Sequence, residues 1–213
     1  MEEKRPVYVK RILISFIIAT ILFSGGFLLG YLVTYSKYQS VSISQEKIRY
    51  QIMDLDLQGK LITSSCDSLN TLPLSSELDN MGSIIGILEE RLGKNDNKVL
   101  EQKKIYSMLE IQHFLLIKDY NKKCNKSIPT LLFFYSNAEE FSDQSNKMGY
   151  VLSNIKSQKK QVMIYSFDYD LNYPLIEILK RNYNITKQNT VLINEKTRLT
   201  DIKNIEDVQK FIK

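Results

Sequence analysis

The sequence predicts an α/β C-terminal domain preceded by a transmembrane helix and an α-helical region, and three observations support this prediction. Residues 12–35 contain no charged side chain, as expected of a helix that crosses a bilayer. Residues 41–123 show apolar residues at helical spacing and no strand-like run. Residues 128–213 alternate short β-prone runs with amphipathic stretches in the order βαβαββα. The expected division of the chain is therefore 1–11, 12–35, 36–127 and 128–213.

The apolar stretch 12–35 is longer than the ~7–15 apolar residues of a typical cleaved signal sequence. We therefore expect an uncleaved anchor in membrane lipid, with a signal sequence cleaved near residues 24–26 as the alternative. Basic residues precede the span at Lys4, Arg5, Lys10 and Arg11. By the positive-inside rule, residues 1–11 are expected in the cytoplasm and the domain after the span is expected outside the cell membrane. Gly26 and Gly30 form a GxxxG, which would allow a homodimer through this helix.

The helical region is expected to contain three helices whose apolar stripes are core faces, with a partner-binding helical surface as the alternative. Pro73, within residues 71–74, is expected to separate the first two helices. Gly93 is a predicted C-cap and Asp96 a predicted N-cap. The three apolar stripes consist of Ile43, Ile48, Ile52, Leu55 and Ile62; of Leu78, Met81, Ile84, Ile85, Leu88 and Leu92; and of Val99, Leu100, Ile105, Met108, Leu109, Leu115, Leu116 and Tyr120.

After Pro129 the hydrophobic period changes from helix-like to strand-like and back several times. The first run, TLLFFY, is continuously apolar or β-prone and predicts a strand buried on both faces. A helical stretch follows it, with Phe141, Met148 and Ile155 on its apolar side. The remaining predicted strands are 162–167, 190–194 and 198–200, and the remaining predicted helices are 173–183 and 205–213.

Three short motifs add to this order of elements: FDYD at 167–170, YNIT at 183–186 and TVLIN at 190–194. Together with the order βαβαββα, they resemble the thioredoxin fold over residues 128–213. The resemblance implies a Cys-x-x-Cys at the start of the first helix of that domain. It also implies a cis-proline just before the third strand, facing the cysteines.

This chain departs from the thioredoxin pattern at both places. Ser142-Asp143-Gln144-Ser145 stands where the two cysteines are expected, and Asn189, before Thr190, stands where the cis-proline is expected. A serine hydroxyl cannot form a disulfide, so dithiol exchange is not available there. The resemblance then implies a site without redox chemistry, retained at Ser142, Ser145 and Asn189 for binding an extended peptide. The alternative is an ordinary first turn with Ser142 as its N-cap.

Cys66 and Cys124 are the two cysteines of the chain. If the domain faces an oxidising space, such a pair suggests a disulfide that links the helical region to the α/β domain. Two inert thiols and a displaced redox pair are the alternatives.

Other features predict no catalytic, metal or nucleotide site. His113 is the one histidine and is expected to be a structural or surface residue, with a catalytic role as the alternative. One histidine and two distant cysteines predict no zinc site with the usual ligand spacing. Asp168 and Asp170 are expected to be the solvated end of a strand, with cation binding as the alternative. The net charge of +5 is spread along the chain without a nucleic-acid-binding motif. We expect no cofactor and no nucleic-acid partner.

Three functional hypotheses remain open. The favoured one is a membrane-anchored, thioredoxin-like module that binds a protein or peptide on the extracytoplasmic side; enzymatic activity is left open, with its absence favoured because the active-site cysteines are replaced. The second is a thiol–disulfide oxidoreductase that uses Cys66 and Cys124. The third is a membrane scaffold whose helices bind the partner.

Overall fold

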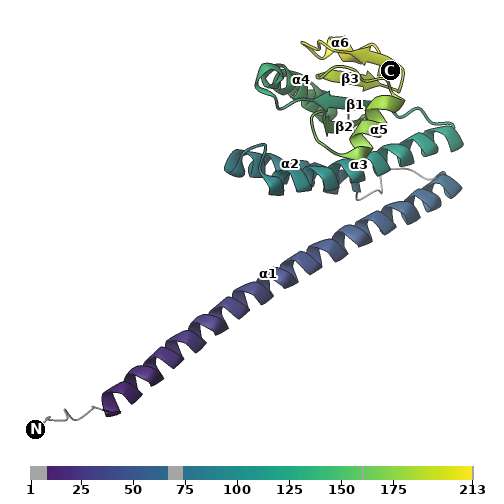
Figure 1. Ribbon diagram of the computed structural model, residues 1–213. Helices are drawn as coiled ribbons and strands as arrows, with labels where there is room; N and C mark the ends of the chain where they lie inside the picture. Colours follow the sequence, from purple (N-terminus) through teal and green to yellow (C-terminus); the bar gives the residue numbers. More distant parts are fainter. Residues whose placement is uncertain (1–8, 67–73, 160, 213) are drawn as a thin grey trace, which may run out of the picture. The chain divides into compact units, whose positions relative to one another are not determined.

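The computed structural model describes residues 9–66, 74–159 and 161–212. The predicted segment 1–11 and the predicted helix break at 71–74 lie largely outside these residues. The chain forms two compact units, Met1–Met53 and Asp54–Lys213. In chain order (Figure 1) the elements are α1 (Val9–Ser65), α2 (Leu74–Leu92), α3 (Asn97–Lys123), β1 (Thr130–Tyr135), α4 (Glu139–Gln158), β2 (Met163–Asp168), α5 (Pro174–Asn182), β3 (Thr190–Ile193), β4 (Thr197–Leu199) and α6 (Glu206–Gln209).

Helix α1 does not end at residue 35, where the predicted membrane helix ends, but continues to Ser65. Within it, Arg11–Tyr31 is long and apolar enough, by length and composition, to cross a membrane, with a mean hydropathy of 2.5. None of its most apolar window is buried against other parts of the chain. Large side chains such as Phe16 and Leu22 are exposed along it. The predicted apolar N-terminal helix is therefore present.

The four strands form one mixed sheet in the order β2-β1-β3-β4. Strand β1 is parallel to β2 and antiparallel to β3, and β3 is antiparallel to β4. The predicted order βαβαββα is observed. Strand boundaries differ from the predicted ones by a residue, whereas α6 is much shorter than the predicted helix 205–213.

Alternate residues of β1 face opposite layers of the unit. Leu131 and Phe133 pack in a cluster with α4 and the C-terminal segment. Leu132 and Phe134 pack in a second cluster with α3 and α5. Because successive strand side chains point to opposite faces, a strand covered on both sides must be apolar throughout. The continuous apolar run TLLFFY therefore correctly predicted a strand buried on both faces.

Helix α3 covers one face of the sheet with a stripe that is partly polar. The start of α3 and the end of α2 are as predicted: the Asp96 side chain accepts a hydrogen bond from the N–H of Lys98, and Gly93, with φ of +89°, follows α2. Leu115, however, is half-exposed, so it is not a core residue. The buried residues of α3 are Val99, Lys103, Ser107, Leu109, Glu110, His113, Phe114, Leu116, Ile117 and Tyr120.

Candidate functional site

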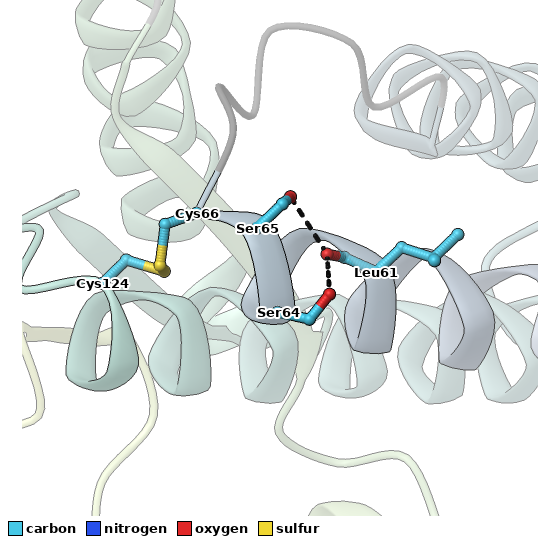
Figure 2. Close-up of a disulfide and its surroundings, with 5 residues drawn as sticks. All are labelled: Leu61, Ser64, Ser65, Cys66 and Cys124. Carbon is cyan, nitrogen blue, oxygen red and sulfur yellow. Dashed lines mark hydrogen bonds between the residues drawn. A yellow bond between two sulfur atoms is a disulfide. The ribbon is translucent and has the colours of Figure 1, made fainter.

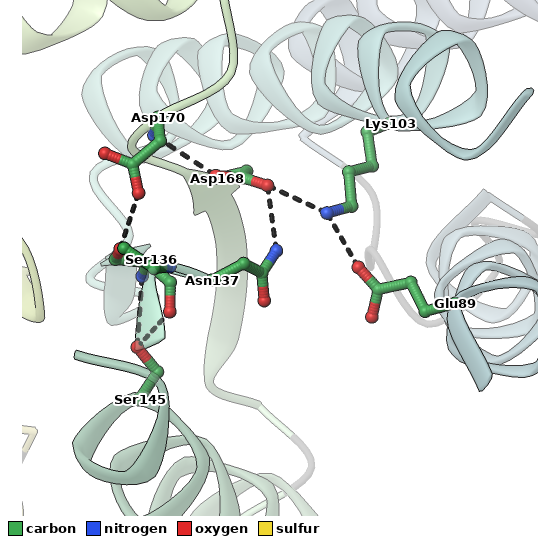
Figure 3. Close-up of polar contacts among 8 residues, drawn as sticks. Glu89, Lys103, Ser136, Asn137, Ser145, Asp168 and Asp170 are labelled. Atoms are coloured by element: carbon green, nitrogen blue, oxygen red, sulfur yellow. Dashed lines mark hydrogen bonds and ion pairs between the residues drawn. The ribbon is translucent and has the colours of Figure 1, made fainter. Parts of the chain in front are cut away.

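The carboxyl ends of β1 and β2 bring several polar residues together. Tyr135 is aligned with Asp168 in the parallel pair, so the residues that follow each strand are neighbours. The hydroxyl of Ser136 donates to Asp170 Oδ2, and the Asn137 amide donates to Asp168 Oδ2 over 3.0 Å (Figure 3). This edge of the sheet lies beside the start of a helix, a place where α/β proteins commonly bind ligands.

Ser145 and Asn189, predicted from sequence to share a site, are in direct contact. The Ser145 hydroxyl accepts the N–H of Ser136 over 3.0 Å, and both Ser136 O and Asn189 Oδ1 lie within hydrogen-bond distance of it. A hydroxyl has a single proton, so it donates to one of these two acceptors at a time. Both residues are at most 5% exposed. Ser145 is thus a buried structural hydroxyl, held by several polar partners.

Asn189 connects the loop before β3 to the first turns of α4. Its amide donates to Phe141 O over 3.0 Å and lies 3.2 Å from Gln144 Oε1. Its φ is +53°, a left-handed conformation that asparagine tolerates better than most residues. The described residues contain no cis peptide bond.

Ser142 does not join the Ser145–Asn189 pair. Helix α4 begins at Glu139 with Ala138 as its N-cap, so the reading of Ser142 as the N-cap is wrong. The N–H groups of Phe141 and Ser142 both donate to Ala138 O. The half-buried Ser142 donates its hydroxyl to Glu139 O over 3.2 Å. The four residues at the start of the helix are therefore 139–142, and none of them is a cysteine.

Asp168 is buried and paired, which corrects its prediction as a solvated strand end. Lys103 of α3 places its Nζ 2.8 Å from Asp168 Oδ2 and 2.7 Å from Glu89 Oε1 of α2 (Figure 3). Lys103 is 2% exposed and Asp168 5%. Buried charges are retained in proteins when they are paired, and this network joins α2 and α3 to the sheet. Sequence reasoning missed Lys103 altogether.

The predicted disulfide between Cys66 and Cys124 is present, with the two Cα atoms 5.5 Å apart (Figure 2). Cys66 follows the last turn of α1, and Cys124 is the C-cap of α3. The bond therefore joins the carboxyl ends of two helices within the unit Asp54–Lys213. Both cysteines lie in the predicted helical region, so the expectation that the bond links this region to the α/β domain is wrong. The hydroxyls of Ser64 and Ser65 both donate to Leu61 O in the same last turn. Cys124 precedes the amino end of β1, whereas the Ser145–Asn189 contact lies beyond the carboxyl end of that strand.

Within the described residues, no group of three or more acidic, histidine or cysteine side chains is arranged to hold a metal ion. No family model matches the chain, and no curated protein or solved structure matches it either.

Proposed function

We propose that this chain is a membrane-anchored, thioredoxin-like module that binds an extended peptide or a partner protein on the extracytoplasmic side, without dithiol chemistry. The observation that carries the proposal is the Ser145–Asn189 contact. This hydrogen bond connects the loop before β3 to α4. In the thioredoxin resemblance, these are the two elements that face each other at the site. The strand order β2-β1-β3-β4, with β1 and β2 parallel, supports the same resemblance.

The proposed binding surface is formed by the start of α4 and the loop before β3. The polar groups beneath it support binding better than catalysis. Ser145 and Asn189 are buried and hydrogen-bonded to each other and to neighbouring backbone. Their role is to hold the exposed residues above them in one arrangement. Those residues include Glu139 and Glu140 at the start of α4 and Lys187 in the loop before β3. A rigid polar surface with both charge signs suits an extended peptide, whose backbone supplies donors and acceptors.

The anchor and the disulfide support an extracytoplasmic location. Arg11–Tyr31 has the length and hydropathy of a spanning helix, and most of the basic residues near it precede it. Disulfides persist in oxidising compartments, and the two cysteines of this chain are bonded. A Cβ added at Gly26 or Gly30 would meet no other part of the described chain, so the proposed homodimer through these glycines has room for a second helix.

The test is a photo-crosslink from the proposed surface in the native membrane. A p-benzoylphenylalanine at Lys187 of the full chain is expected to give one discrete adduct. Ser142→Trp, which projects a bulky ring from the first turn of α4, is expected to abolish it. The matched control Ser127→Trp changes an exposed serine before the amino end of β1 and is expected to leave the adduct unchanged.

Two results would contradict the proposal. One is an adduct that survives Ser142→Trp while the variant keeps the wild-type unfolding midpoint. The other is reduction of insulin disulfides by the purified protein, because the proposal assigns no redox cysteine to this surface.

A further inference from the structure

A cavity of about 430 Å³ lies among α2, α3, α4 and β2, and the proposed binding surface does not use it. Cavities of this size are within the range of small-molecule sites. Its apolar lining includes Leu78, Val162 and Ile164. Its ionisable lining consists of Asp79, Tyr106, Glu110, His113, Lys156 and Tyr165.

Two deeply buried side chains of this cavity each leave one polar atom without a partner. Glu110 and His113 are both 1% exposed. Glu110 Oε1 accepts the N–H of Ser166 over 2.9 Å, and His113 Nδ1 lies 2.9 Å from the hydroxyl of Tyr165. Glu110 Oε2 and His113 Nε2 have no partner in good hydrogen-bond geometry, although the Tyr106 hydroxyl lies close enough to the Glu110 carboxyl to act against the rise of its pKa. Buried polar atoms are rarely left in this state, so a ligand in the cavity would satisfy both.

The charges around the cavity favour a positive ligand. Asp79 and Lys156 form an ion pair with each other at its partly exposed side. The buried carboxylate of Asp168 and the partly buried carboxylate of Glu89, both nearby, share Lys103. Glu110 therefore differs from the other buried acids, because no salt bridge to it exists among the described residues. A buried carboxylate is stable when a cation accompanies it.

We infer that this cavity binds a small alkylammonium ion, whose ammonium group pairs with Glu110 Oε2 and donates a second hydrogen bond to His113 Nε2. The imidazole accepts at Nε2 when its Nδ1–H donates to Tyr165, and an ammonium donor selects that tautomer. The apolar side chains of Leu78, Val162 and Ile164 accommodate the alkyl part. Binding of this kind goes beyond the proposed peptide surface and does not depend on it.

Binding is expected to be linked to a proton. Burial raises the pKa of Glu110 to about 8, so in the empty cavity at neutral pH its carboxyl is mostly protonated. The other titratable groups near it are Asp79 from α2, Tyr106 from α3, Lys156 from α4 and Tyr165 from β2. An ammonium ion stabilises the ionised carboxylate, so up to one proton leaves for each ligand bound near pH 7.

The experiment uses the full chain in lipid nanodiscs, labelled with ¹³C at histidine Cε1. His113 is the one histidine of the chain, so one signal reports the cavity. The probes are n-butylammonium, n-butanol and n-butyrate, which share the alkyl chain and differ in the head group. The ammonium alone is expected to shift the signal saturably. Glu110→Gln is expected to weaken its binding at least about tenfold through loss of the charge-assisted bond, whereas the matched Glu101→Gln, on the exposed side of α3, leaves it unchanged.

Calorimetry of the wild type in two buffers of different ionisation enthalpy provides a readout that needs no variant, and proton release on binding is the expected result. The inference is overturned if n-butanol shifts the His113 signal as strongly as n-butylammonium does, or if no saturable shift occurs. Unchanged affinity in Glu110→Gln, or binding without proton release, also overturns it.

Discussion

Removal of the Cys66–Cys124 disulfide is expected to lower the free energy of unfolding of the unit Asp54–Lys213 by about 4 kcal/mol. The two cysteines are 58 residues apart in sequence, and the bond prevents that loop from opening in the unfolded chain. The chain-entropy relation gives about 4 kcal/mol for a loop of this length at 25 °C. The dependence on loop length is weak, since halving the loop changes the value by only about 0.6 kcal/mol.

Urea unfolding of the full chain with both cysteines changed to serine is the assay. The protein has no tryptophan and 13 tyrosines, so near-ultraviolet circular dichroism of tyrosine reports the packing of the unit. With a slope of about 2 kcal/mol per molar urea, the unfolding midpoint is expected to fall by about 2 M. Chemical reduction of the wild type should produce the same shift. A midpoint that moves by less than about 0.5 M in both cases would refute the view that this bond holds the carboxyl ends of α1 and α3 together.

Two further predictions concern the polar residues of α3. Lys103→Met leaves the buried Asp168 and the partly buried Glu89 without their cation and is expected to cost about 3–5 kcal/mol. Lys104→Met, at a partly exposed pair, is expected to cost about 0–1 kcal/mol. Comparison of the two urea midpoints checks this, and equal midpoints would contradict it. Burial raises the pKa of Glu110 from 4.5 to about 8 and lowers that of His113 from 6.5 to about 4. The raised acid favours the folded state at low pH and the depressed histidine favours it at high pH, so the two effects oppose each other between pH 4.5 and 6.5. Stability should therefore fall as pH rises from 6.5 to 8, by at most ~1.4 kcal/mol per unit. The pH series of urea midpoints for Glu110→Gln should lack this fall, and a fall that persists in that variant would show that another group causes it.

The buried strand β1 could be predicted because its own residues show that both of its faces are covered. The run TLLFFY is apolar at every position, and the structure buries alternate residues on two opposite faces. Gly93 and Asp96 marked the junction of α2 and α3 because each has a backbone role that few residues perform. The shortness of α6 was not predictable in the same way, since helix ends depend on tertiary packing more than on propensity.

The candidate site was predicted in part. Asn189 and Ser145 were found because the order of elements placed them near each other, whereas Ser142 was misplaced because the register of the helix start was taken three residues late. Lys103, Glu110 and His113 were missed as members of a buried stripe, since their partners in β2 are 52 to 65 residues away in sequence. A signal did exist: these three residues continue the spacing of three and four that relates the buried apolar residues of α3.

The unit has two polar regions, one at the carboxyl ends of the strands and one under α3. They differ in whether their buried polar atoms all have hydrogen-bond partners. At the carboxyl ends of the strands, Ser145 and Asn189 use their side chains on each other and on nearby backbone, so that region presents a surface and not a reactive group. Under α3, Glu110 and His113 each retain a buried atom without a hydrogen bond of good geometry beside a cavity that is partly open to solvent. Unpaired polar atoms in a buried site discriminate strongly between ligands, because a ligand that lacks the matching group leaves them unpaired. Recognition of a partner by shape is therefore expected at the first region, and recognition of a specific head group at the second.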